Sequence, residues 1–116
     1  MSVSRRDGFL QRISTVGGGT RDAIQMGVGS IVCDVRDMVE RGVFAEEEME
    51  AVIGFHDHTE EFWRQLMATA PPMDPMLMVA GLRQLRALCS QPLAGFALRL
   101  DQMIEKAEAF AARKRH

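Results

Sequence analysis

Two histidines and three acidic residues lie close together in the segment His-Asp-His-Thr-Glu-Glu at residues 56–61. Imidazole and carboxylate groups are ligands for zinc, iron or manganese, so His56, His58 and Glu60 form a candidate metal site. His56 and Glu60 are four residues apart and would share one face of a helix. Di-iron bundles, however, take ligands from several helices, and the other predicted helices offer no inward-facing His or Glu. The competing interpretation is a core histidine, with the His56 imidazole hydrogen-bonded to Glu60 or Thr59.

Catalysis by these residues is not indicated. An exposed His58 could accept a phosphoryl group, but Glu60 and Glu61 follow it and no cation is nearby to hold the phosphate. Cys33 and Cys89 form no CxxC pair, and neither has a basic neighbour in sequence that would favour the reactive thiolate. No Ser/His/Asp or Cys/His arrangement is present. We therefore expect a protein that is not an enzyme and that carries no cofactor.

The histidines belong to a helix that the apolar periodicity predicts over residues 44–70. Its apolar stripe is wide enough to contact two neighbouring helices, which is typical of a central bundle helix. Gly42 suits the left-handed end of the preceding helix, and Pro71-Pro72 ends this one. The predicted stripe consists of Phe44, Ala45, Met49, Ala51, Val52, Phe55, His56, Phe62, Trp63, Leu66 and Met67.

Four further helices are predicted. A short one near the N-terminus ends at Gly17-Gly18-Gly19, a glycine-rich hinge, so that residues 1–19 form an arm and residues 20–116 a helical bundle. Thr20, Asp74 with Pro75, and Ser90 with Pro92 are helix-start signals for the other three. Their predicted buried residues are Ile24, Val28, Ile31, Val32, Val35, Met38 and Val39; then Leu77, Met78, Gly81, Leu82, Leu85, Leu88 and Cys89; then Leu93, Phe96, Ala97, Leu100, Met103, Ile104, Ala107 and Phe110. Short connections make such helices antiparallel neighbours, so the predicted fold is an all-α, four- to five-helix antiparallel bundle.

Composition limits the classes of function. A chain of 116 residues with 47% hydrophobic and 26% charged residues is one ordinary globular domain rather than a disordered one. It contains no apolar run long enough to span a membrane and no apolar signal-peptide core, so we expect a cytoplasmic, bacterial protein with reduced cysteines. A net charge of −2 makes nucleic-acid binding unlikely as an overall property.

Charge is unevenly distributed along the chain. Residues 34–61 contain ten acids and two arginines, a net charge of −8, whereas the rest of the chain carries +6. We call the exposed acids of this region the acidic ridge and interpret it as a docking surface for a basic protein partner; the alternative is an ordinary solvated helix face. The acidic ridge consists of Glu46, Glu47, Glu50, Asp57 and Glu61.

A second candidate surface lies on the helix predicted after residue 20. Met26, Gly29 and Cys33 share its reverse face, where a small residue would let another helix approach and a methionine would adapt to it. This face predicts a two-fold homodimer. The leading interpretation is thus a non-enzymatic interaction module, such as an adaptor, chaperone, inhibitor or subunit, and the alternative is the metal-binding bundle.

Overall fold

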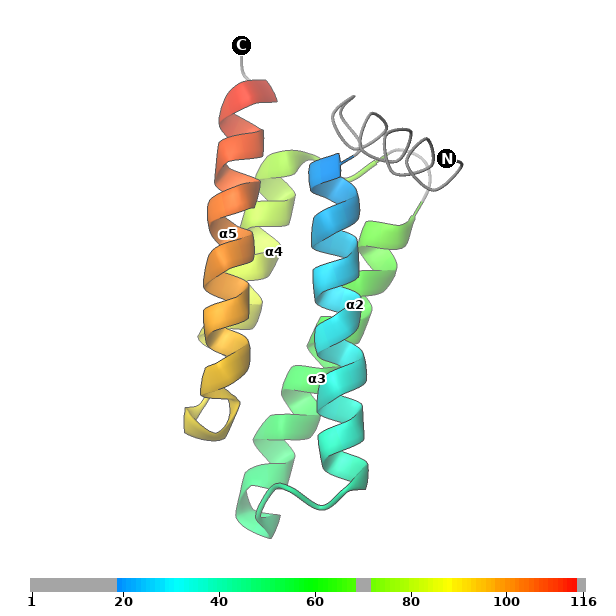
Figure 1. Cartoon of the computed structure of the whole chain (residues 1–116), viewed down its shortest axis with the longest axis vertical. Coiled ribbons are helices and arrows are strands. Elements are labelled where there is room, and N and C mark those ends of the chain that lie inside the picture. The colour runs from blue at the N-terminus through cyan, green and yellow to red at the C-terminus, as the bar shows by residue number, and fades with distance from the viewer. Residues whose placement is uncertain (1–18, 69–71, 115–116) are drawn as a thin grey trace, which may run out of the picture.

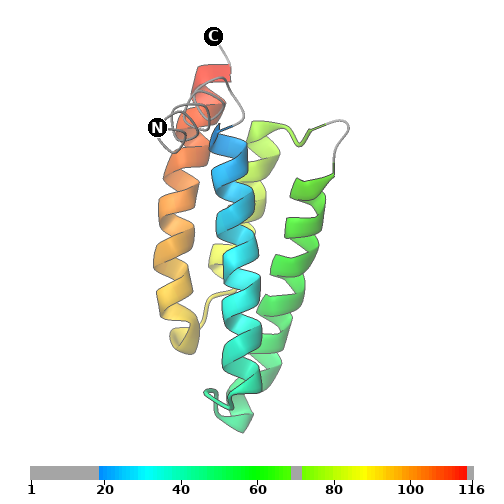
Figure 2. The same cartoon turned by 45° about the vertical axis from the view of Figure 1, so that its right-hand side comes forward.

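The computed structural model describes residues 19–68 and 72–114, and in that part of the chain it contains four α-helices and no strand. The helices run alternately in opposite directions and form an antiparallel four-helix bundle (Figures 1 and 2). The predicted all-α bundle is confirmed. The predicted N-terminal helix and most of its glycine hinge, at residues 1–18, lie outside the described residues. The helices are α2 (Gly19–Glu40), α3 (Met49–Met67), α4 (Pro75–Ala87) and α5 (Ala94–Lys114), and 3-10 turns η2 (Glu46–Glu48) and η3 (Gln91–Leu93) precede α3 and α5.

Each helix has two main neighbours. The closest pairs are the hairpins α2–α3 and α4–α5, which are joined by the contacts of α2 with α5 and of α3 with α4. α3 is therefore not more central than the other helices, although its wide stripe does contact two of them. Burial of these apolar side chains is the main favourable contribution to folding. The fully buried core residues include Ile24, Val28, Ile31, Val35, Val52, Phe55, Met78, Leu82, Leu93 and Leu100.

The helix starts depend on local capping. Asp74 is the N-cap of α4, its Oδ1 accepts a hydrogen bond from the Met76 N–H at 2.8 Å, and Pro75 occupies the first turn as predicted. Gly42 adopts the left-handed conformation, with φ of 69°, after α2 ends. Thr20, in contrast, is itself helical, as is Gly19 before it, so it is not the N-cap of α2.

The predicted helix over residues 44–70 is too long at both ends. Phe44 and Ala45 belong to the connection, and the three glutamates after them form η2 before α3 begins at Met49. The Glu48 carboxylate accepts a hydrogen bond from the Ala45 N–H at 2.9 Å, which stabilises this turn. The described helix ends at Met67.

Three residues predicted to be buried are exposed: Met67 (50%), Leu77 (61%) and Leu88 (40%). In α4 the buried positions are Met78, Val79, Leu82 and Leu85, and Leu77 and Leu88 lie together along one side of this line. Ala45 and Ala51, at the edges of the predicted stripe, are exposed as well. No helix among the described residues is both long and apolar enough to cross a membrane.

Candidate protein-interaction surface

The acidic ridge lies at the end of the bundle where α2 turns into α3, and it continues along the outer face of α3 (Figure 1). All five of its residues are exposed. Within the part of the chain that the structure describes, Glu46, Glu47, Glu50 and Glu61 form no ion pair, and Asp57 contacts only the Nδ1 of His56, at 3.0 Å. The ridge therefore presents carboxylates that no cation of the described bundle neutralises.

Five other acids of the described bundle are paired with an arginine. Four of these pairs link α5 to α2, α4 to α5 and α2 to α3, the fifth lies at the end of α2, and each is at least partly exposed, so its contribution to stability is small. None of these arginines forms an ion pair with a carboxylate of the ridge. The pairs are Asp34–Arg99 (2.8 Å), Asp37–Arg41 (3.2 Å), Asp101–Arg86 (2.9 Å), Glu60–Arg36 (2.6 Å) and Glu108–Arg83.

The helix start accounts for part of the acid density. Glu46, Glu47 and Glu50 lie in the first turns of η2 and α3, where the positive end of the helix dipole favours a carboxylate by about 0.3–1 kcal/mol. Asp57 and Glu61 lie in the middle and last third of α3, so this effect does not reach them. The dipole thus explains the beginning of the ridge but not its length.

His56 is half-buried and interacts mainly with Arg36, which the sequence analysis did not single out. Its Nε2 accepts from the Arg36 guanidinium at 3.3 Å, so its Nδ1 carries the proton and donates to Asp57. The Arg36 guanidinium also binds Glu60 at 2.6 Å, and Arg64 reaches the other oxygen of Glu60 at 3.4 Å. The predicted hydrogen bond from His56 to Glu60 or Thr59 is wrong. Arg36, from α2, instead binds both His56 and Glu60.

The three candidate metal ligands do not converge. His58 donates from its Nδ1 to the Gly54 carbonyl at 2.8 Å, and being two residues from His56 it points to a different side of α3. The Glu60 carboxylate is bound by two arginines. Among residues 19–68 and 72–114, no group of three or more His, Cys, Asp or Glu side chains is placed to hold a metal ion.

A shallow groove of about 410 Å³ lies beside the ridge, between α3 and the end of α4. Along α3, Glu47, Ala51, Gly54 and His58 form one line at helical spacing, with the small residues in its middle. Leu88 forms the opposite wall. We call this feature the α3 groove; Glu50 and the buried Phe55 complete its lining.

Gly54, in the interior of α3, differs from three other glycines inside helices of the described chain, whereas Gly95, in the first turn of α5, has an open Cβ position as Gly54 does. A Cβ at Gly27, Gly29 or Gly81 would meet Met103, Trp63 or Phe62 at 2.6, 2.8 and 2.2 Å, so close packing within the bundle requires these glycines. A Cβ at Gly54 would have nothing within 4 Å. A glycine in the interior of a helix costs about 0.5–1 kcal/mol relative to alanine, and no contact within the described bundle explains this one.

The predicted dimer face on α2 is partly covered by the chain itself. Gly29 packs against the Trp63 indole of α3, which is the close helix approach that a small residue permits. Met26 is 74% exposed and Cys33 is also exposed. The structure therefore leaves two of these three residues available on the surface.

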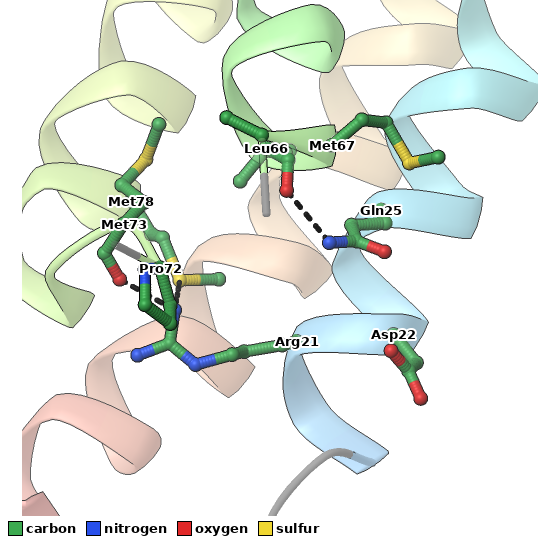
Figure 3. A pocket seen from close by; sticks show the side chains of 9 residues that line it. Arg21, Asp22, Gln25, Leu66, Met67, Pro72, Met73 and Met78 are labelled. Atoms are coloured by element: carbon green, nitrogen blue, oxygen red, sulfur yellow. Dashed lines mark hydrogen bonds between the residues drawn. The ribbon is translucent and has the colours of Figure 1, made fainter. Parts of the chain in front are cut away.

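At the opposite end of the bundle lies a pocket of about 370 Å³ between the start of α2, the end of α3 and the start of α4 (Figure 3). Two of its polar side chains, Arg21 and Gln25, are already bonded within the chain, and Asp22 is exposed. Arg21 donates to the Met73 carbonyl, lies 3.7 Å from the Met78 sulfur and stacks over the Phe110 ring. Gln25 donates to the Leu66 carbonyl at 2.7 Å, which satisfies the end of α3. This pocket is part of the scaffold.

Both cysteines are free thiols. Burial raises the pKa of the Cys89 thiol, and nearby Asp101 adds to this, while Arg86 opposes it. The expectation that neither cysteine has a basic neighbour thus fails for Cys89, since the helical turn brings Arg86 close. Burial has the larger effect, so Cys89 is not an activated nucleophile.

No protein-family model, curated protein or solved structure matches the chain.

Proposed function

We propose that this protein is a non-enzymatic helical module that binds a basic protein partner through the acidic ridge. The observation that carries the proposal is the set of exposed carboxylates, Glu46, Glu47, Glu50 and Glu61, that form no ion pair among the described residues. Like charges gathered on one face repel one another, and a partner with complementary charge relieves that repulsion and is steered toward the face.

The charge distribution of the rest of the bundle supports the same function. The arginines of the described chain that pair with acids do so outside the ridge, although Arg41 lies in the α2–α3 connection and Arg36 and Arg64 bind Glu60 on α3. Arg21, Arg113 and Lys114 lie around Phe110, toward the opposite end of α5 from the α2–α3 connection. An electrostatic docking face whose carboxylates have no ion pair in the described chain binds quickly and is sensitive to salt.

The test is partner capture with matched charge reversals. The wild-type chain, Glu50→Lys and Glu105→Lys are used as baits in extract from the source cell, and retained proteins are identified by mass spectrometry. Glu105 is an exposed acid of α5 without an ion pair among the described residues, so both variants change the net charge equally. The proposal predicts a basic partner that wild type and Glu105→Lys retain, that Glu50→Lys loses, and that is released at about 1 M salt, where the screening length is roughly 3 Å.

The contradicting result is equally defined. If Glu50→Lys and Glu105→Lys retain the same proteins in the same amounts, or if the retained proteins survive high salt, the ridge is a solvated face and the proposed function is wrong.

A further inference from the structure

The geometry points to the α3 groove as the binding site for one helix of the basic partner. This helix is amphipathic: it places an apolar side chain against Leu88 and cationic side chains on Glu47 and Glu50. This inference rests on the proposed function and specifies the form of the partner. It follows from three properties of the groove: its lining, the space at Gly54 and the arrangement of charge around it.

The lining combines an apolar wall with small residues. Leu88 is 40% exposed at the end of α4, although its neighbours in the apolar pattern are buried. Opposite it, the small residues Ala51 and Gly54 make a depression in the surface of α3, and the buried Phe55 forms its base. A groove with one projecting leucine and a low helix surface accommodates a second helix with a large apolar side chain.

Gly54 supplies independent support. Its Cβ position is open, so packing inside the described bundle gives no reason for a glycine there, in contrast to Gly27, Gly29 and Gly81. Glycine in a helix destabilises it relative to alanine, so a compensating gain from outside the bundle is expected. Close approach of another backbone is one of the uses of glycine that would offset this cost.

The charges select a basic occupant. Gly54 lies in a line with Glu50, Asp57 and Glu61 at helical spacing, so it is the one gap in a row of carboxylates. Glu47 and Glu50 border the groove itself. At its other end, the Nδ1 of His58 donates to the Gly54 carbonyl, so this ring nitrogen is already bonded within α3. The carboxylates of Glu47 and Glu50 accept hydrogen bonds and favour arginine or lysine.

The probe is a synthetic peptide of leucine and lysine, about 14 residues or roughly four helical turns long, with its leucines on one helix face. A scrambled peptide of the same composition, which has no apolar face, is the control ligand. Binding of each fluorescent peptide is measured by polarisation for the wild-type chain, Gly54→Leu, Ala109→Leu and Glu50→Lys. Ala109→Leu adds the same side chain to an exposed position of α5.

A leucine at position 54 has open space and replaces a helix-breaking residue, so Gly54→Leu should unfold no more easily than wild type. The inference predicts that Gly54→Leu weakens the patterned peptide by roughly tenfold or more, as loss of a well-packed apolar contact does, while Ala109→Leu leaves it unchanged. Glu50→Lys should weaken both peptides.

The opposite outcomes separate the two proposals. If Glu50→Lys weakens binding of both peptides but Gly54→Leu weakens neither, the ridge binds basic partners, and the inference that the α3 groove binds a partner helix is wrong. If Glu50→Lys has no effect on either peptide, both proposals fail. If the wild-type chain is a dimer in native mass spectrometry and Gly54→Leu is a monomer, the occupant is a second copy and the separate partner helix is wrong.

Discussion

The two ends of the bundle use their polar side chains in opposite ways. At one end, the Arg21 and Gln25 side chains are bonded to neighbouring elements: a loop carbonyl, a sulfur and an aromatic ring for Arg21, and a helix end for Gln25. At the acidic ridge the carboxylates are exposed and four of the five form no ion pair among the described residues. The first end maintains the fold, and the second is available to another molecule.

The pocket and the groove show the same difference. The pocket at the Arg21 end has a volume of about 370 Å³ and the α3 groove about 410 Å³, so size does not distinguish them. What distinguishes them is whether the lining already has partners. In the pocket, Arg21 fixes the segment before α4; in the groove, a Cβ at Gly54 would have no neighbour within 4 Å and Leu88 is 40% exposed.

The largest expected effect is a loss of stability when the contacts at the Arg21 end of the bundle are removed. Arg21→Ala removes a charged hydrogen bond to a carbonyl and a cation–π contact with Phe110, and should lower the free energy of unfolding by about 2–4 kcal/mol. Arg113→Ala removes an exposed, longer contact with the same ring and should cost less than about 1 kcal/mol. Urea unfolding measures both. Equal losses for the two variants would show that Arg21 does not hold this end together.

Substitution of glycine by alanine should change the stability of the protein in opposite directions at Gly81 and Gly54. Gly81→Ala forces a Cβ against the buried Phe62 ring and should destabilise the protein by about 1–3 kcal/mol. Gly54→Ala meets open space and should stabilise it by about 0.5–1 kcal/mol. Thermal unfolding of both variants tests whether Gly54 has a role within the bundle, because a loss of stability in Gly54→Ala would mean that it does.

A smaller change in unfolding free energy should distinguish a glutamate of the scaffold from a glutamate of the ridge, both of them in α3. Glu60→Gln weakens the ion pairs with Arg36 and Arg64 and should cost about 0.5–1 kcal/mol in unfolding free energy. Glu61→Gln removes a carboxylate that has no ion pair in the described chain and lies beyond the reach of the helix dipole, and should change it by less than about 0.5 kcal/mol. Urea unfolding at low salt is the measurement, and a Glu61→Gln loss as large as that of Glu60→Gln would place Glu61 in the scaffold.

The smallest expected effect is a difference between the alkylation rates of the two thiols. The pKa of Cys89 is raised, so at neutral pH a smaller fraction of it is thiolate, and its alkylation should become fast only at higher pH than is usual for a thiol. Cys33 is exposed and should react first with iodoacetamide. Mass spectrometry of the Cys33→Ser and Cys89→Ser variants over a pH series separates the two rates. Faster reaction of Cys89 at neutral pH would contradict its burial.

Helical periodicity in the sequence was sufficient to predict the all-α bundle and most of the core, as Ile24, Val28, Val52, Leu82 and Leu100 illustrate. Residues at the edges of a stripe were less predictable. Leu77, Leu88 and Met67 are apolar and correctly spaced, but whether they are covered depends on how the helix is rotated against its neighbours, which periodicity does not specify.

The site was predictable only in part. The acidic ridge follows from local sequence, since consecutive glutamates at a helix start are exposed almost regardless of the tertiary fold. The Arg36 contact with His56 and Glu60 joins residues more than 20 positions apart, so no local pattern reveals it. Gly54 was a usable signal: a glycine within a helical acidic face calls for an explanation, but only the packing shows that none lies inside the described bundle.

The most direct test of the account is to map where the patterned leucine–lysine peptide binds the full chain, by ¹H–¹⁵N NMR shift changes at low salt. We expect shifts concentrated from Glu47 in η2 to His58 in α3, and at Leu88. Shifts concentrated around Arg21, Met73 and Met78 would contradict the proposal, because the bound pocket and not the exposed ridge would then be the binding surface.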